Sequence, residues 1–202
     1  MPTGYLALGD SYTIGEAVAA DERWPALLVR QLRADGLPID EPQIIAVTGW
    51  TTDELAQGMD QAALHPPYAL VSLQIGVNNQ YRGRPADEYR TQFAALLARA
   101  TALAGGRAAR VVVVSIPDWG VTRFAGDQGR DRSVIAAELD VYNAIARHES
   151  ARAGAGFVDV TGISRAHPQL VAADGLHPAA DQYRRWLAAI APVAAAALRT
   201  QD

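Results

Sequence analysis

Four short segments of this chain carry residue types that together could break an acyl bond. Ser11 lies in a Gly-Asp-Ser sequence near the N-terminus, and Asp174 and His177 lie three residues apart near the C-terminus. A serine hydroxyl becomes an effective nucleophile when a base removes its proton, and the histidine side chain suits that role because imidazole titrates near neutral pH. A carboxylate on the far ring nitrogen fixes the imidazole tautomer and stabilises the imidazolium.

Two further segments offer hydrogen-bond donors for the oxyanion that forms during acyl transfer. Such donors must lie about 3 Å from the developing charge. Gly49 can bring its backbone N–H close to a substrate because it has no Cβ, and Asn78 adds a side-chain amide. Ser11 can add its own backbone N–H if a helical turn begins there. The spacing of Asp174 and His177 also allows a local carboxylate–imidazole hydrogen bond.

These residues must be positioned by alternating strands and helices. Short apolar runs alternate with longer helical patterns, which is typical of βαβ units and a parallel sheet. We expect strands over residues 5–9, 43–47, 68–75, 110–116 and 157–160. We expect helices over residues 24–34, 51–61, 87–104, 132–153 and 178–198, with a loop over 117–129. Three of the four polar segments follow strand ends, where ligands bind in open parallel sheets.

The expected fold is therefore α/β: a three-layer α/β/α sandwich with a central parallel sheet of about five strands. The 202 residues, half of them hydrophobic, fit one domain spanning residues 1–202. The segment between residues 117 and 129, together with residues near positions 50 and 81, is expected to form the pocket. Trp50, Tyr81 and Trp119 are candidates for its walls, as is Phe124, although each could equally serve core packing.

Composition excludes several classes of site. The chain has no cysteine, which excludes disulfides and cysteine nucleophiles, and it has no lysine, which excludes Schiff-base chemistry. The formal net charge is −4 and no basic stripe is present, so we do not expect nucleic acid as a partner. No apolar run approaches the ~20 residues of a membrane span, and no signal peptide is recognisable, so we expect a cytoplasmic protein.

At the four polar segments the chain resembles the SGNH, or GDSL-type, hydrolase family. The matching segments are Gly-Asp-Ser-Tyr-Thr from residue 9, Val-Thr-Gly-Trp from residue 47, Gly-Val-Asn-Asn from residue 76 and Asp-Gly-Leu-His-Pro from residue 174. They occur in the family's order and extend over nearly the whole chain. The resemblance implies a flavodoxin-like sandwich and a serine esterase that acts on a small acyl ester without metal or cofactor.

The resemblance also implies a role for each residue. Ser11 would be the nucleophile, His177 the base and Asp174 its orienting acid. Asp159, at the end of the last expected strand, is a possible rival for that last role, but the spacing and the motif favour Asp174. Ser11, Gly49 and Asn78 would form the oxyanion hole.

Two positions depart from the family pattern. Tyr12 follows the serine where the name-giving motif has leucine, which is a common variation. Asn79 replaces the acid that usually ends the third segment. This change leaves the donor Asn78 in place, and we expect it to affect the contacts that hold the loop rather than catalysis.

Three other functions remain open. A phosphate- or flavin-binding module of the same fold class could use the helix start at Ser11, although it would leave Asn78, Asp174 and His177 without a role. A catalytically silent, carbohydrate-binding relative and an esterase for acetylated sugars are further alternatives. The motifs do not select the acyl length, the alcohol or the oligomeric state.

Overall fold

Five parallel strands form the centre of the protein, in the order β2-β1-β3-β4-β5. The computed structural model describes residues 2–199. The strands are β1 (Tyr5–Gly9), β2 (Pro42–Ala46), β3 (Leu70–Gln74), β4 (Val111–Val114) and β5 (Gly156–Val158). This order is the flavodoxin-like arrangement, in which the carboxyl ends of the strands meet at one edge of the sheet.

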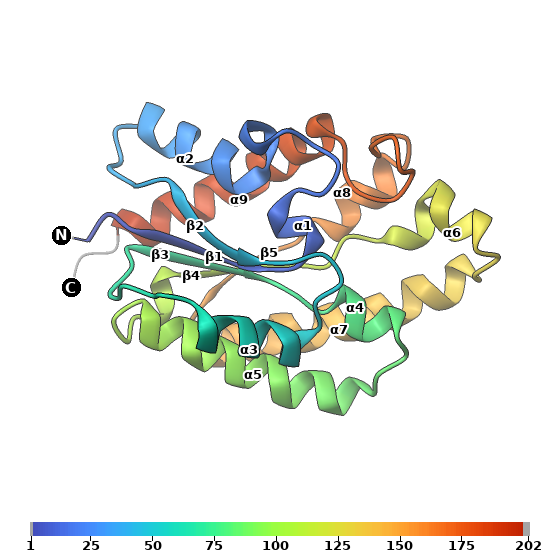
Figure 1. Ribbon diagram of the computed structural model, residues 1–202, viewed down its shortest axis with the longest axis horizontal. Coiled ribbons are helices and arrows are strands. Elements are labelled where there is room, and N and C mark those ends of the chain that lie inside the picture. The colour runs from blue at the N-terminus through green and yellow to red at the C-terminus, as the bar shows by residue number, and fades with distance from the viewer. Residues whose placement is uncertain (1, 200–202) are drawn as a thin grey trace.

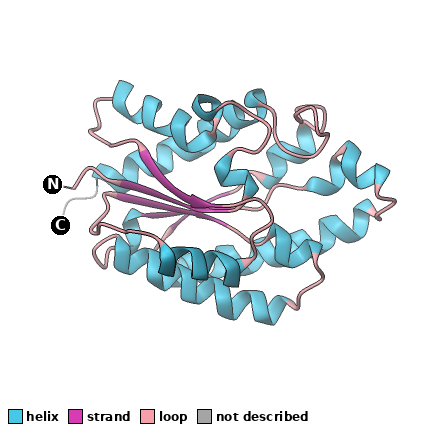
Figure 2. Ribbon diagram, in the orientation of Figure 1, coloured by secondary structure: helices cyan, strands magenta, loops and turns pink. Residues whose placement is uncertain are grey.

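Helices cover both faces of the sheet (Figure 1). One face is covered by α2 (Trp24–Ala34) and α9 (Ala180–Arg199), and the other by α3 (Thr52–Gln61), α5 (Ala86–Leu103) and α7 (Arg132–Ala153). Figure 2 shows the resulting three layers, with the strands between two sets of helices. The prediction of a three-layer α/β/α sandwich with five parallel strands is confirmed.

Short helices and turns lie mainly near the carboxyl ends of the strands. They are the α-helices α1 (Ser11–Ile14), α4 (Val77–Tyr81), α6 (Arg123–Asp127) and α8 (Thr161–Ala166), and the 3₁₀-helices η1 (Ala20–Glu22), η2 (Ala108–Arg110) and η3 (Trp119–Val121). The predicted strands and long helices agree with the structure to within two residues at each end.

The expectation of a loop over residues 117–129 is wrong, because η3 and α6 occupy most of that segment. Both η3 and α6 begin at a side-chain cap. The carboxylate of Asp118 accepts the N–H of Gly120 at 2.8 Å, and the hydroxyl of Thr122 accepts the N–H of Ala125 at 3.4 Å. Such caps satisfy N–H groups that the helix itself leaves free, and they need no long apolar pattern.

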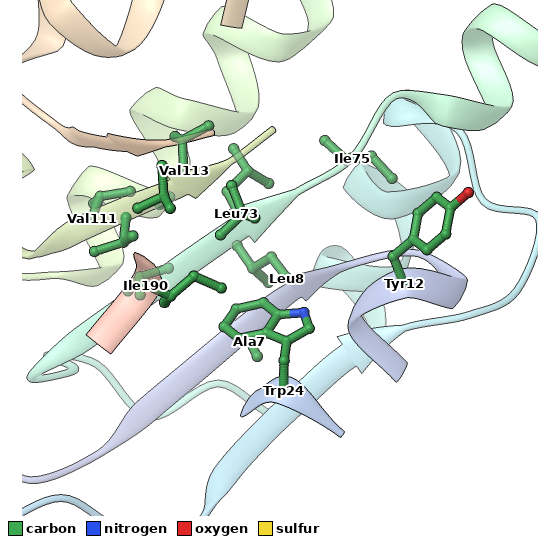
Figure 3. Packing of buried hydrophobic residues seen from close by; sticks show 14 of the residues in the cluster. Ala7, Leu8, Tyr12, Trp24, Leu73, Ile75, Val111, Val113 and Ile190 are labelled. Carbon is green, nitrogen blue, oxygen red and sulfur yellow. The ribbon is translucent and has the colours of Figure 1, made fainter. Parts of the chain in front are cut away.

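The core holds the strands rigidly beneath the helices. Figure 3 shows Trp24 beside Ala7 of β1, together with the buried side chains of Leu8 on β1, Leu73 on β3 and Val113 on β4. All five are at most 1% exposed, and the indole Nε1 of Trp24 donates to Gln74 at 3.1 Å. Full burial of one large apolar side chain contributes about 1.5–3 kcal/mol, so this packing fixes the strand ends that carry the polar segments.

Within residues 2–199, none of the helices combines the length and the apolar character that a membrane crossing requires.

Candidate active site

Ser11 is placed by the tight turn between β1 and α1. Asp10 caps α1, with its Oδ1 accepting the backbone N–H of Tyr12 at 3.0 Å, and Ser11 is the first helical residue. A Cβ at Gly9 would overlap the side chain of Thr13 and the carbonyl of Gln74, so only glycine fits before the cap. The first N–H groups of a helix have no intrahelical acceptor, which leaves them available to an anion.

Asp10 joins this turn to the next one. Its side chain is 1% exposed and accepts backbone N–H groups from Tyr12 and from Gly76, the residue before α4. Burial raises the pKa of Asp10 to about 7, although those hydrogen bonds act in the opposite direction. The carboxylate therefore ties the start of α1 to the start of α4.

His177 is oriented by Asp174 as the spacing suggested. The Nδ1 atom of His177 lies 2.6 Å from Oδ2 of Asp174, whose Oδ1 accepts the N–H groups of Leu176 and His177 at 2.9 and 3.0 Å. Burial alone would raise the pKa of Asp174, but these hydrogen bonds outweigh it and lower the pKa below its usual range. An ionised carboxylate can only accept, so Nδ1 carries the proton and Nε2 is left free as a base.

Gly49 has the backbone conformation that glycine favours, with φ of +89°. The nearest atom to a Cβ at this position would be a guanidinium nitrogen of Arg82 at 4.0 Å, so space is available there. The left-handed backbone thus favours glycine here, and the open space beside it leaves room for the close approach of a substrate that we expected from sequence. Arg82 also donates to the carbonyl of Gly49 at 2.7 Å, which holds this turn.

Asn78 and Asn79 are adjacent on α4 and make different contacts. The Nδ2 atom of Asn78 donates to the carbonyl of Trp50 at 2.9 Å, which uses one of its two N–H groups. Asn79 is fully buried; its Oδ1 accepts the N–H of Thr52 at 3.1 Å and its Nδ2 donates to the Thr52 hydroxyl at 2.7 Å. The residue that replaces the usual acid therefore binds α4 to the start of α3.

One pocket of about 200 Å³ collects the polar residues named above. We call it the site pocket, and its lining is mostly apolar. Four of these residues, from four separate segments of the chain, line it: Ser11, Gly49, Asn78 and His177. The lining consists of Ser11, Tyr12, Thr48, Gly49, Val77, Asn78, Tyr81, Trp119, Phe124, Leu176 and His177.

The candidate wall residues divide into two groups. Tyr81, Trp119 and Phe124 line the site pocket, whereas the ring of Trp50 packs against Gly58 of α3, where a Cβ would overlap it. Trp50 reaches the site only through its backbone carbonyl.

Asp159, the possible rival of Asp174, lies in another network. It pairs with Arg147 at 3.1 Å and accepts the N–H of Thr161 at 2.9 Å.

Sequence reasoning missed four lining residues. Thr48, Val77, Leu176 and Tyr12 each adjoin a motif residue, and this adjacency was the only signal that could have found them. Across residues 2–199, no three histidine or acidic side chains are grouped so that they could hold a metal ion.

The fold recurs in esterases of known structure. A psychrotrophic esterase from Pseudoalteromonas sp. has 17% identity and a TM-score of 0.71, covering 95% of this chain and 96% of that one. A lipase/acylhydrolase from Enterococcus faecalis has 20% identity, a TM-score of 0.71 and coverage of 95% and 94%. An acetylxylan esterase from Geobacillus stearothermophilus has 16% identity, a TM-score of 0.70 and coverage of 98% and 95%.

The sequence comparisons differ in what they find. Curated protein sequences gave no match. The sequence profile of the GDSL-like lipase/acylhydrolase family matches residues 7–185, a span that includes all four polar segments. The chain therefore belongs to the GDSL-like lipase/acylhydrolase family.

Proposed function

We propose that the protein is a serine esterase that hydrolyses small acyl esters. The observation that carries this proposal is the lining of the site pocket, where Ser11, Gly49, Asn78 and His177 meet, with Asp174 on the far side of the imidazole. A nucleophile, an oriented base and preorganised N–H donors around one pocket are the requirements for acyl transfer.

The reaction proceeds in two halves. Ser11 Oγ attacks the ester carbonyl carbon as His177 Nε2 accepts the hydroxyl proton, and the N–H groups of Ser11, Gly49 and Asn78 stabilise the oxyanion. Collapse of the tetrahedral intermediate breaks the ester C–O bond, and the alcohol leaves with the proton from His177. A water molecule, deprotonated by His177, then attacks the acyl carbonyl carbon. The bond to Ser11 Oγ breaks as His177 returns the proton to that oxygen, which releases the carboxylic acid.

The test combines covalent labelling with turnover. A fluorophosphonate probe should label Ser11, and Ser11→Ala should lose both labelling and hydrolysis of p-nitrophenyl acetate, with a drop in kcat on the order of 10⁶. Ser133→Ala is a matched control, because Ser133 lies at the start of α7 outside the site pocket, and it should keep full activity. Near-normal turnover by Ser11→Ala would refute the proposal.

An esterase for acetylated sugars is the second candidate, favoured by the similarity of the fold to an acetylxylan esterase. An acetyl group would occupy the site pocket and the sugar would lie outside it. Faster release of acetate from acetylated xylose than from p-nitrophenyl acetate would favour this candidate.

A flavin-binding module would instead show flavin absorption bands in the purified protein, and we expect none.

A further inference from the structure

Two cavities lie back to back at the carboxyl end of the sheet. The second is a small cavity of about 10 Å³, the space of roughly one water molecule. Tyr12, Trp119 and Leu176 line both this cavity and the site pocket. Because these three side chains face both spaces, they form the wall between them.

The second cavity is lined by both apolar and polar residues. Val121, Val171 and Pro178 contribute apolar surface, whereas Asp118, Thr122, Ser164 and Gln182 contribute polar groups. At about 10 Å³ this cavity is too small to take an alkyl chain, so room for a longer chain depends on the size of the wall residues themselves.

Trp119 is the most firmly held member of the wall. Its Nε1 donates to Oε1 of Gln80 at 2.8 Å, and Nε2 of Gln80 donates to Glu138 at 2.6 Å. Trp119 and Gln80 are both 2% exposed. The guanidinium of Arg130 lies 5.3 Å from the indole centroid, and the ring of Tyr81 lies at 5.4 Å. These contacts prevent the indole from turning aside when a long chain enters.

The other two wall residues are tied to the acid–base pair. The ring of Tyr12 packs edge-on against the imidazole of His177 at 5.8 Å. The backbone N–H of Leu176 donates to Asp174 at 2.9 Å. Among the described residues, Trp119 bonds to Gln80 and packs against Tyr81 and Phe124 rather than against Asp174 or His177, so its size can change without directly altering the acid–base pair.

We propose that Trp119, held in position by Gln80, limits the length of the acyl chain that the esterase accepts. This inference rests on the proposed esterase function and makes it one for short acyl chains. Gln80 is a positioning residue, because it acts on the substrate only through the indole.

The test measures kcat/KM for p-nitrophenyl esters of straight-chain acids from acetate to dodecanoate. In the wild type, kcat/KM should rise by up to about fourfold per added methylene until the chain reaches Trp119, and should then fall. Trp119→Leu should move that limit to longer chains. For the first ester beyond the wild-type limit, kcat/KM should rise about tenfold or more.

Phe124→Leu is the matched control, because it also removes an aromatic ring from the site pocket. Phe124 does not line the second cavity, and although it packs edge-on against Trp119 at 6.2 Å, the indole is still held by Gln80 in this variant. Phe124→Leu should therefore change kcat/KM by a similar factor for every chain length and leave the limit in place. Gln80→Met keeps the indole but removes its acceptor, so KM for chains beyond the limit should fall while kcat for the acetate ester stays unchanged. If Trp119→Leu does not fold, Leu176→Ala and Gln80→Met decide the question.

Several results would overturn the inference. The limit could stay unchanged in every wall variant, or Phe124→Leu could move it as far as Trp119→Leu does. In a series of alkyl acetates, kcat/KM could also show the limit with the length of the alcohol instead of the acyl chain. That result would place the leaving group in the site pocket. All of these leave labelling of Ser11 intact. Absence of labelling and of hydrolysis by the wild type would instead refute the proposed esterase function, and this inference with it.

Discussion

The side-chain amide of Asn78 has two N–H groups. One donates to the carbonyl of Trp50 at 2.9 Å, and in the proposed mechanism the other would donate to the oxyanion. The bond to Trp50 orients the amide before substrate arrives, so little reorganisation is needed as negative charge develops.

Asn78→Ala should lower kcat by about 10²–10³ with little change in KM, because an oxyanion donor acts mainly on the transition state. Steady-state kinetics on p-nitrophenyl acetate measure this effect. Asn143→Ala provides the control, since Asn143 also bonds a backbone carbonyl, that of Ile116, but lies outside the site pocket. It should lower stability and keep kcat; equal losses of kcat in both variants would contradict the role of Asn78.

Asp10 makes stability depend on pH in an unusual direction. The unfolded chain releases this proton near pH 4, whereas burial raises the pKa in the folded state to about 7. The folded state therefore binds more protons between these values. Stability from this group is complete below about pH 4 and is lost as the pH rises to about 7.

Asp10→Asn should remove that loss. Relative to the wild type, the variant's free energy of unfolding should rise between pH 4 and pH 7 by a few kcal/mol, on the order of 1.4 kcal/mol per pKa unit. Urea unfolding at several pH values measures it. Asp131→Asn is the control at an exposed cap, where hydrogen bonds from Ser133 and Val134 lower the carboxyl pKa. For Asp131→Asn, the free energy of unfolding relative to the wild type should fall as the pH rises, and this change should appear at acid pH. If the difference in the free energy of unfolding between Asp10→Asn and the wild type stayed constant from pH 4 to pH 7, the titration of the buried Asp10 carboxyl would be contradicted.

At the scale of elements, the site depends on contacts between loops that belong to different βα units. Asn79 of α4 bonds both the N–H and the hydroxyl of Thr52, at the start of α3. The Thr52 hydroxyl in turn donates to Gln92 of α5. The turn that carries Gly49 is thereby joined to the helix that carries Asn78.

Asn79→Ala should destabilise the protein by about 1–3 kcal/mol, because the buried N–H of Thr52 loses its acceptor. Asn79→Asp should destabilise less, since a carboxylate can accept both groups of Thr52 if the amide of Gln92 turns to donate. Urea unfolding of the two variants compares them. Equal stability of Asn79→Ala and the wild type would show that this contact between α3 and α4 contributes nothing.

At the scale of the whole molecule, α9 contacts α1 beside Ser11, although the two helices lie far apart in the sequence. The hydroxyl of Tyr183 in α9 donates to the carbonyl of Tyr12 in α1 at 3.1 Å, across a sequence separation of 171 residues. The ring of Trp186 packs against Tyr12 at 6.2 Å. The terminal helix thus supports the short helix that begins at Ser11.

Tyr183→Phe should cost about 1–3 kcal/mol, because the buried carbonyl of Tyr12 loses its donor. In a protein of this size each kcal/mol lowers Tm by roughly 2–4 °C, which thermal unfolding can measure. We also expect a lower kcat, since Ser11 precedes Tyr12 in the same turn. Tyr142→Phe is the control: its hydroxyl donates to the carbonyl of Arg84 away from Ser11, so Tm should fall and kcat should not. Equal effects on kcat would refute the coupling.

The sequence by itself determined the fold class, the long helices and strands, and the four polar segments. These properties follow from local apolar periodicity and from motifs of a few residues, which do not depend on distant parts of the chain. The short helices near Trp119 escaped prediction because single side-chain caps begin them.

Only the tertiary structure decided which side chains meet. The contact of Asp174 with His177 was expected from their spacing, but the choice between the tryptophans was not: Trp119 lines the site pocket while Trp50 packs on α3. Local sequence cannot distinguish the two tryptophans, because their positions depend on how elements far apart in the chain pack against one another. The contact from Gln80 to Trp119, across 39 residues, is of the same kind.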